Sequence, residues 1–431
     1  MKIKFVDWYG WFIVACILGT LYLLGFYCSM WFDLSLQLSA FSVSSFFVFD
    51  VVSFYLSLLS VFLLLVLAFS YSNTTGRSLF YIIMSVVSSL FCYCSNYVFF
   101  FWFFYEVSIL SLLFLLIVES PYSERYLAGW YLSGYVMLTS LPMLLCLLYF
   151  SLVSGSLFMS EWCSNDVVFF GDLTFCIVLI LAILFITKIP VPPFHIWLPI
   201  VHAEATSLVS VCLSGYIMKL GLLGVCRFCW WLVPNYIFGL GYISVCFFLS
   251  VLFFLMASWE LDGKRWLAFL SLSHIIICAV CFSSCLYDSS SLLFLYSLGH
   301  GLSAGLMFIM LWWGYNLSGS RNWLILKVVL GGSLYFRVLI CLGLCTVASL
   351  PPVVQFFIEV LVINSAGLLS FVLFLLFCVY LFFSSLVPLF FLGSLLSRHF
   401  CMSYDNFSGC VSFSVLLGYL IIWSFIVFVV I

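Results

Sequence analysis

Apolar runs of about twenty residues recur along this sequence, and they limit the fold more than any other feature. A helix of that length crosses a bilayer, whereas the strands of an outer-membrane barrel alternate in polarity over about ten residues. Of the 431 residues, 67% are hydrophobic and only 6% are charged. Because no aqueous surface can be built from that composition, the sequence predicts an all-α polytopic membrane protein.

The apolar runs predict about 13 transmembrane helices, within a range of about 12 to 14. They are Trp8–Met30, Phe46–Tyr71, Ser78–Ser95, Tyr97–Val118, Leu127–Val153, Leu173–Trp197, Ser207–Trp230, Tyr236–Trp259, Trp266–Leu286, Leu292–Tyr315, Leu334–Ile363, Ala366–Leu392 and Val411–Ile431. The stretch Trp31–Ser45, interrupted by Asp33 and Gln37, stays open as a degenerate further span. The first run has no small-residue cleavage site, so we interpret it as a retained span and not as a signal peptide.

Charge and cysteine content exclude several classes of function. A net charge of −2 leaves no footprint for nucleic acid and no polybasic anchor for lipid headgroups. The 19 cysteines lie in apolar runs, where free thiols act as small packing groups. The one C-x-x-C pair, Cys226 and Cys229, has no second pair to complete a metal site. We therefore expect neither disulfides nor a bound metal.

The basic residues predict an orientation. When the predicted spans alternate across the bilayer, most Lys and Arg residues fall on one side, as they do on the cytoplasmic or matrix side of membrane proteins. This side receives Lys2, Lys4, Arg77, Arg125, Lys264, Arg265, Arg321, Lys327 and Arg398. Only Arg227 ends near the opposite side. We expect the N-terminus on the basic side and the C-terminus on the other.

Two predicted spans are broken by prolines. Lys188–Pro193 (KIPVPP) interrupts the sixth span, and Leu350–Pro352 (LPP) interrupts the eleventh. The two breaks lie five predicted spans apart, and this odd number places the two units that contain them in opposite orientations across the bilayer. Such an arrangement is typical of inverted repeats with discontinuous helices in ion transporters. We expect one transmembrane domain over 1–431, with a first repeat at about 78–230, a second at about 236–392 and terminal helices outside them. Two independent proline kinks are the alternative.

Six ionisable residues lie within or beside predicted spans, where each charge costs at least about 2.5 to 3.5 kcal/mol on insertion scales. They are Glu106, Lys188, Lys219, His274, His300 and Glu359. As a set they are typical of a chain of proton-exchanging groups. Singly, a buried histidine is often only a packed core residue, and a lysine near a span end can snorkel. We interpret Asp50 as an interfacial helix cap and Arg337 as structural.

The motifs around these residues resemble a known family. They are Phe104–Glu106 (FYE), Lys188–Pro190 (KIP), His195–Pro199 (HIWLP), His202–Ala205 (HAEA), Lys219–Gly221 (KLG), Asp262–Arg265 (DGKR), Ser273–His274 (SH), Gly299–Leu302 (GHGL) and Leu350–Pro352 (LPP) with Glu359. In this order and spacing, over roughly Asp50 to Leu392, they resemble the antiporter-like subunits of respiratory NADH:ubiquinone oxidoreductase (complex I), the subunit 4 type in particular. The fourth-subunit likeness rests on Glu359, since the sister subunits 2 and 5 have lysine at that position.

The resemblance implies a proton-translocating membrane-arm subunit driven by quinone reduction elsewhere in the complex. It implies a Glu106–Lys188 pair, then Lys219, His274, His300 and Glu359 as the proton relay. It also implies no cofactor in this chain, with flavin, iron–sulfur clusters and ubiquinone in partner subunits. Other membrane-arm subunits, including neighbouring antiporter-like ones, and lipid are the expected partners, with no nucleic acid. The expected location is the mitochondrial inner membrane with the N-terminus in the matrix, or a bacterial plasma membrane if the chain is not organellar.

The sequence departs from the family pattern in a few places. Ile200 follows Pro199 where the family has a lysine, and Thr206 stands where a proline commonly follows the His-x-Glu-Ala motif. The family usually has about fourteen spans against the predicted thirteen. Two other functions stay open: a Mrp-type cation/proton antiporter subunit, and a structural spacer that does not pump.

Overall fold

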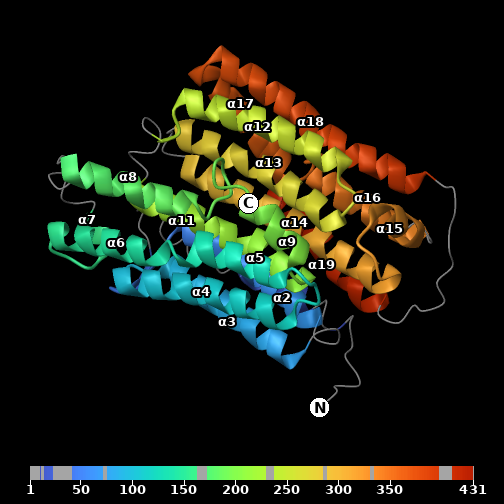
Figure 1. The fold of residues 1–431 in the computed structure, drawn as a ribbon, viewed down its shortest axis with the longest axis horizontal. Helices are drawn as coiled ribbons and strands as arrows, with labels where there is room; N and C mark the ends of the chain where they lie inside the picture. Colours follow the sequence, from blue (N-terminus) through green and yellow to red (C-terminus); the bar gives the residue numbers. More distant parts are fainter. Residues whose placement is uncertain are drawn as a thin grey trace.

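The computed structural model describes residues 10, 14–22, 41–70, 75–162, 172–229, 237–284, 289–330, 334–397 and 410–430. Most of these residues form helices that lie side by side along the long axis of the molecule (Figure 1). Among the described residues, nine helices are long and apolar enough to cross a membrane. The predicted polytopic helical architecture is confirmed.

The elements follow one another closely along the chain. After a helical stretch at 14–22, the first half contains β1 (Phe41–Ser44), β2 (Phe47–Phe49), α2 (Val51–Phe69), α3 (Gly76–Cys94), α4 (Val98–Glu119), α5 (Arg125–Leu132), the π-helix η2 (Ser133–Met137), α6 (Ser140–Ser154), α7 (Met159–Trp162), α8 (Asp172–Ile186), α9 (Trp197–Glu204), α10 (Ser207–Cys212), the π-helix η4 (Leu213–Ile217) and α11 (Met218–Cys229). The second half contains α12 (Leu240–Trp259), α13 (Gly263–Ser284), α14 (Ser289–Ser318), α15 (Trp323–Leu330), α16 (Leu334–Val347), α17 (Val354–Leu369), α18 (Phe371–Leu396) and α19 (Cys410–Val430).

Every predicted span after the first has a helical counterpart, but two details differ. The short helix α15 was not predicted, because its eight residues fall below the length of a span. The predicted boundary between Ile363 and Ala366 is wrong, since α17 continues to Leu369. The side chain of Ser370 then accepts a hydrogen bond from Leu373 N and starts α18.

Residues 41–50, directly before α2, are not helical. β1 and β2 pair as an antiparallel hairpin, so the end of the stretch 31–45 is not part of a further span. Asp50 caps α2 as predicted: its carboxylate accepts from Ser53 N at 2.8 Å and lies 3.6 Å from the Arg227 guanidinium. The first predicted span lies mostly outside the described residues, as do Lys2, Lys4 and Arg398.

Both predicted helix breaks are present. The backbone leaves the helical conformation between α8 and α9, at 187–196, and between α16 and α17, at 348–353. Protein encloses the two breaks only in part. Residues such as Ile189 and Ser349 are buried, whereas Pro193, Pro351 and Pro352 are exposed on the surface of the chain. Proline has no backbone N–H, so its exposed position leaves no donor without a partner.

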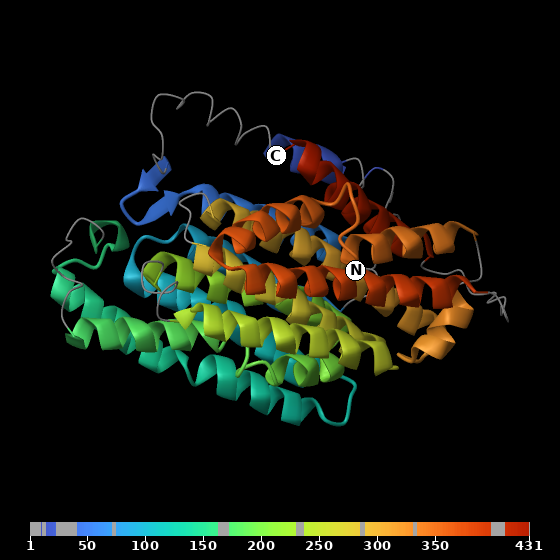
Figure 2. The same ribbon diagram turned by 90° about the horizontal axis from the view of Figure 1, so that it is seen from above.

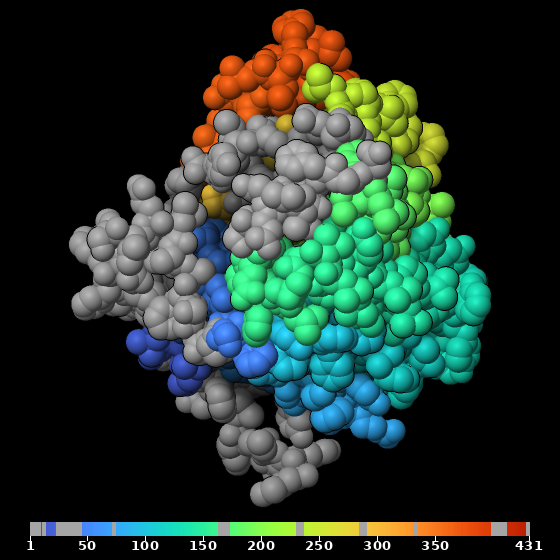
Figure 3. Space-filling model, turned by 90° about the vertical axis from the view of Figure 1, so that its left-hand side faces the viewer, coloured from blue at the N-terminus to red at the C-terminus, as the bar shows by residue number. Residues whose placement is uncertain are grey.

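The two halves of the chain pack into one hydrophobic core. Figure 1 shows α3, α4, α5 and α6 on one side and α12, α17 and α18 on the other, with α11, α13 and α14 between them. Figure 2, seen from above, shows helices of both halves running along the same long axis. The central helix α14 packs against α2 and α10 from the first half and against α13, α16, α17 and α19 from the second. Seen from one end, in Figure 3, the first half lies below and the second half above. Groups on α14 can therefore contact both halves.

Basic residues gather at one end of the molecule. Arg125 donates to Ser120 O beside the end of α4, and Lys264, at the start of α13, donates to Ala205 O beside the start of α10. Arg227 lies at the other end, where it donates to Ser95 O beyond the end of α3. The asymmetry agrees with the predicted charge distribution, and the direction of the N-terminus stays a prediction.

Candidate functional site

The six candidate ionisable residues all lie in the interior. Their residue exposures are 9% for Glu106, 1% for Lys188, 0% for Lys219, 3% for His274, 3% for His300 and 2% for Glu359. They come from α4, the first break, α11, α13, α14 and α17, in that order. Such burial of charged groups in a membrane protein normally marks a functional site.

Glu106 and Lys188 form the first group. Lys188 follows α8 at the start of the break, and its Nζ lies 3.8 Å from Glu106 Oε1. The same ammonium lies 4.2 Å from the centre of the Tyr105 ring, in the range of a cation–π contact. The predicted proximity of the two side chains is confirmed, and their role in proton transfer stays a prediction.

Glycines let α11 pack directly against this break. A Cβ atom at Gly221 would lie 2.8 Å from Ile189 Cγ1 and 3.1 Å from the carbonyl oxygen of Phe185. A Cβ at Gly224 would overlap the Phe185 ring at 2.2 Å. A larger residue at either position would separate the two helices. The KLG motif therefore places Lys219 on the helix that packs directly against the broken span.

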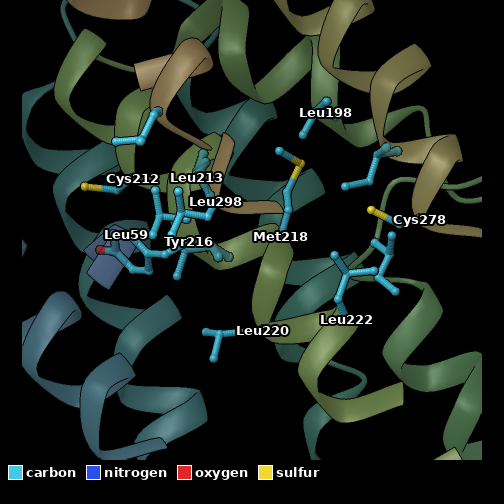
Figure 4. Close-up of a cluster of buried hydrophobic side chains, with 14 of the residues drawn as sticks. Leu59, Leu198, Cys212, Leu213, Tyr216, Met218, Leu220, Leu222, Cys278 and Leu298 are labelled. Atoms are coloured by element: carbon cyan, nitrogen blue, oxygen red, sulfur yellow. The ribbon is translucent and has the colours of Figure 1, made fainter. Parts of the chain in front are cut away.

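Lys219 is held by a backbone irregularity in its own helix. In the π-helical segment η4, Met218 N bonds to Leu213 O, five residues back, and thereby leaves Ser214 O, four residues back, to another donor. The Nζ of Lys219 donates to that Ser214 carbonyl. Figure 4 shows the neighbouring Met218 and Leu220 side chains among buried apolar groups. The ammonium is thus directed by the bulge and does not snorkel to a surface.

Two histidines form a cluster with Lys219. The Nδ1 atom of His300 lies 3.1 Å from Lys219 Nζ, so a neutral imidazole can accept a hydrogen bond there. The His274 ring lies next to His300, with 6.0 Å between the ring centres. On its other side, His274 Nδ1 lies 2.8 Å from the Tyr380 hydroxyl. The structure thus brings Lys219, His300 and His274 into one cluster.

Glu359 is held at the second break. Ser349 Oγ donates to Glu359 Oε2 at 2.8 Å, while the other carboxylate oxygen is buried without a hydrogen-bond partner in the described chain. Ser349 has φ of 46°, a left-handed conformation that is unfavourable for a residue with a Cβ atom. Its unusual backbone directs the hydroxyl from the break toward the carboxylate.

Gln355 ties α14 to α17 one helical turn before Glu359. With the amide oriented to satisfy both groups, its nitrogen donates to Thr346 O at 3.1 Å and its oxygen accepts from His300 N at 3.3 Å. A Cβ at Gly299 would lie 2.9 Å from Gln355 Cγ, so glycine is needed for this approach. Gln355 therefore fixes the distance between the His300 backbone and the helix that carries Glu359.

The candidates fall into three groups and not into one continuous chain. In the described part of the chain, no hydrogen bond or ion pair joins Lys188 to Lys219, or His274 to Glu359. Ser349, Gln355 and Tyr380 were not predicted as site residues. Serine, glutamine and tyrosine carry no insertion penalty comparable to a charge, so their positions gave no signal. The position of Ser349 directly before the LPP motif was the only available hint.

The end of α9 is held by groups from the second half of the chain. Lys264 Nζ donates to Ala205 O at 2.7 Å, and the Arg321 guanidinium donates to Ala203 O. Arg321 also lies 3.4 Å from Asp262 Oδ2 and 4.2 Å from the centre of the Tyr122 ring. Cationic groups at the carboxyl end of a helix stabilise it. We call Tyr122, Lys264 and Arg321 the α9 clamp.

A cavity of about 230 Å³ lies beside this clamp. Polar side chains line much of it, among them Thr75, Glu119, Tyr122, Thr206 and Asn316. The volume and the donors and acceptors suffice for several ordered water molecules. The cavity lies at the same end as the basic residues that set the charge asymmetry.

The cysteines of the described chain are free thiols, and these include Cys226 and Cys229. Among the described residues, the structure contains no group of three or more His, Cys, Asp or Glu side chains arranged to hold a metal ion. The expectations about disulfides and metals stay predictions for the protein in the membrane.

Broken helices and buried acid–base groups define the class of antiporter-like polytopic membrane proteins. Residues 95–385 match the family model described as NADH:quinone oxidoreductase/Mrp antiporter, transmembrane. The chain belongs to this family.

Curated relatives carry the name NADH-ubiquinone oxidoreductase chain 4. The protein of Ceratitis capitata is 31% identical over 339 residues, which cover 75% of this chain and 73% of the relative. The protein of Caenorhabditis elegans is 27% identical over 74% of this chain and 76% of the relative. For the protein of Rhipicephalus sanguineus, at 27% identity, the match covers 66% of this chain and 65% of the relative, slightly under two thirds of its length.

Solved structures share the fold. A chain of respiratory complex I from Thermus thermophilus superposes with a TM-score of 0.76 at 21% identity, covering 88% of this chain and 82% of that chain. A chain of the Mrp complex from a Dietzia species superposes with a TM-score of 0.73 at 14% identity, covering 89% and 81%. The two neighbours represent the two functional branches that the family name contains.

Proposed function

We propose that this chain is the subunit 4 type of antiporter-like subunit in the membrane arm of NADH:ubiquinone oxidoreductase, and that it translocates protons. One observation carries the proposal: three groups able to bind a proton lie next to one another in the buried core, in the spatial order Lys219, His300 and His274. Lys188 with Glu106 and Glu359 with Ser349 lie at the two helix breaks. The names of the curated relatives support the assignment to subunit 4.

Proton transfer begins at the Glu106–Lys188 pair. The Glu106 carboxylate stabilises the ammonium form of Lys188, so a longer separation favours loss of its proton. Quinone reduction in partner subunits drives that change. The proton passes through water to Lys219, and then to His300 and His274 before it reaches Glu359. Each group returns to its starting state when the next proton arrives.

The chemistry of electron transfer belongs to other subunits. We assign no cofactor to this chain, and flavin, iron–sulfur clusters and ubiquinone to its partners. The partners are other membrane-arm subunits, among them neighbouring antiporter-like subunits, and membrane lipid. We assign the chain to the mitochondrial inner membrane, with its N-terminus on the matrix side. The eukaryotic sources of the curated relatives and the charge asymmetry support this location.

We also propose two inverted repeats, at about 78–230 and about 236–392. Each contains one broken helix, at 187–196 and 348–353, with an ionisable residue at or near the break. The terminal helices lie outside the repeats and pack against both through α2 and α19.

A Mrp-type cation/proton antiporter subunit is the second candidate, because the Dietzia Mrp chain shares the fold. The two candidates differ in their partners. Mass spectrometry of the intact assembly distinguishes them: flavin and iron–sulfur subunits that copurify with the chain support the first candidate. Their absence from an intact assembly supports the second.

Glu359→Gln tests the proposed function in the assembled complex. The substitution keeps the size of the side chain but removes the proton-binding carboxylate, so proton uptake per electron in sealed vesicles should fall while some electron transfer remains. Glu124→Gln is the matched control, since Glu124 is exposed and its side chain does not cap α5. Glu359→Lys, the sister subunits' residue, should also fail, because a second cation resists accepting a proton from the Lys219 cluster.

An assembled Glu359→Gln complex with unchanged proton uptake per electron would exclude Glu359 from the path. If Lys188→Met also pumps normally, the chain is a structural spacer. These two results together would overturn the proposed function.

A further inference from the structure

Tyr380 connects the histidine cluster with the helix pair that carries Glu359. It lies on α18, is fully buried, and its hydroxyl lies 2.8 Å from His274 Nδ1. Its ring packs against Phe247, Phe254 and Phe377, with 5.5 to 5.7 Å between ring centres. The aromatic contacts fix the ring, so the hydroxyl stays directed at the imidazole.

The helix that carries Tyr380 also packs against the helix that carries Glu359: α17 lies against both α18 and α13. The Tyr296 hydroxyl donates to the backbone carbonyl of His274 at 3.3 Å. In the part of the chain that the structure describes, no direct bond links His274 to Glu359, so a proton passing between them needs an intermediate group, and both phenol hydroxyls lie at His274.

We propose that Tyr380 is a relay residue that carries the proton from His274 to Glu359. The inference rests on the proposed function, and it fills the gap between two of the three groups of ionisable residues. The Tyr380 hydroxyl is the one group within hydrogen-bond distance of His274 Nδ1 in the described chain.

The tyrosine has the same protonation state before and after the transfer. The N–H bond at His274 Nδ1 breaks as a new O–H bond forms on the Tyr380 oxygen. The original O–H proton of Tyr380 moves through water to Oε1 of Glu359, because that oxygen has no hydrogen-bond partner in the described chain. His274 is left neutral, Glu359 is protonated, and Tyr380 is again a neutral phenol. Rotation of the hydroxyl away from His274 and toward Glu359 resets the step, and water is the only other participant.

A purely structural role for the hydroxyl makes different predictions. Buried tyrosine hydroxyls need a hydrogen-bond partner, and His274 supplies one. In that case, removal of the hydroxyl changes stability only. In a relay role, it slows proton transfer at this step by about 100-fold, the low end for a positioned acid or base. A readout of proton transfer therefore separates the two roles.

Tyr380→Phe tests the inference in the assembled complex in sealed vesicles. The ring and its packing remain and only the hydroxyl is lost. Proton uptake per electron should fall to the level of Glu359→Gln, and the double variant should fall no further, because both changes block one step. Tyr93→Phe is the matched control: Tyr93 is equally buried, on α3, which packs against α2 and α4.

Infrared spectroscopy supplies a second measurement. The carboxyl band that disappears in Glu359→Gln belongs to Glu359. It should shift in Tyr380→Phe and stay unchanged in Tyr93→Phe. If the Phe variant does not assemble, Tyr380→His takes its place: the imidazole carries protons, so this variant should pump. An assembled His variant that does not pump would overturn the inference.

Normal proton uptake in Tyr380→Phe, together with loss in Glu359→Gln, would overturn the role of Tyr380 and leave the proposed function intact. Normal uptake in both variants would instead contradict the proposed function itself. The two failures are therefore distinguishable.

Discussion

The Nζ atom of Lys188 lies 3.8 Å from Glu106 Oε1 in the first broken span, and neither side chain makes a hydrogen bond within the described chain. The pair is therefore held by charge and by the surrounding packing. The distance between the two charges can therefore increase or decrease without breaking a directional bond. This geometry suits a pair whose separation controls whether the lysine keeps its proton.

The first prediction concerns the two charges of this pair. Lys188→Met or Glu106→Gln alone leaves one buried group without its partner, which costs about 3 to 5 kcal/mol for a buried pair. The double variant removes both charges and should assemble better than either single variant, although it does not pump. Native gels measure assembly and vesicle assays measure pumping. Lys327→Met is the control, because Lys327 bonds to Ser397 at an exposed site; a double variant that assembles worse than both singles would contradict the prediction.

The second prediction concerns the contact between Lys219 and His300. Asparagine at position 300 places an amide oxygen near the position of Nδ1 and can accept from Lys219, whereas leucine cannot. Both His300→Asn and His300→Leu should stop proton transfer. Only the leucine variant should also lower thermal stability, by about 1 to 3 kcal/mol for an unsatisfied buried donor. Equal melting temperatures for the two variants would refute the hydrogen-bonding role.

The third prediction concerns Ser349. Ser349→Ala removes the donor to Glu359 and should lower stability by about 1 to 3 kcal/mol, together with a decrease in pumping. Ser365→Ala is the matched control on α17, where the hydroxyl only bonds to Val362 O within its own helix. Its effect should stay within about 0.5 kcal/mol. Thermal inactivation and proton uptake measure both quantities, and an indistinguishable pair of variants would count against the assignment.

The fourth prediction concerns the α9 clamp. Lys264→Met leaves Ala205 O without its donor, so the stability of the assembled complex should fall by about 1 to 3 kcal/mol. Proton uptake per assembled complex should stay unchanged, because the clamp only holds the end of α9. Arg77→Met at the same end is the control, since Arg77 is exposed. Loss of pumping at normal stability would show that Lys264 takes part in proton transfer.

The sequence by itself determined the class of fold and most of the candidate site. Apolar runs fixed the helical spans, because a helix satisfies its own backbone in lipid. The prolines at 190–193 and 351–352 fixed the two breaks, because proline removes a helical hydrogen bond. Glu106, Lys188, Lys219 and Glu359 were identified because a charge in an apolar run is costly and needs a reason.

Only the tertiary structure decided which of these residues meet. His300 and Lys219 are 81 positions apart in the chain, and His274 and Tyr380 are 106 apart. These contacts depend on how α11, α13, α14 and α18 pack, and local sequence does not encode that packing. The Ser214 carbonyl and Tyr380 were not found in advance because a carbonyl exists at every residue and a tyrosine in an aromatic helix looks like core. Their chemistry comes from position: a π-helical bulge exposes one carbonyl to Lys219, and the aromatic contacts around Tyr380 direct one hydroxyl at His274.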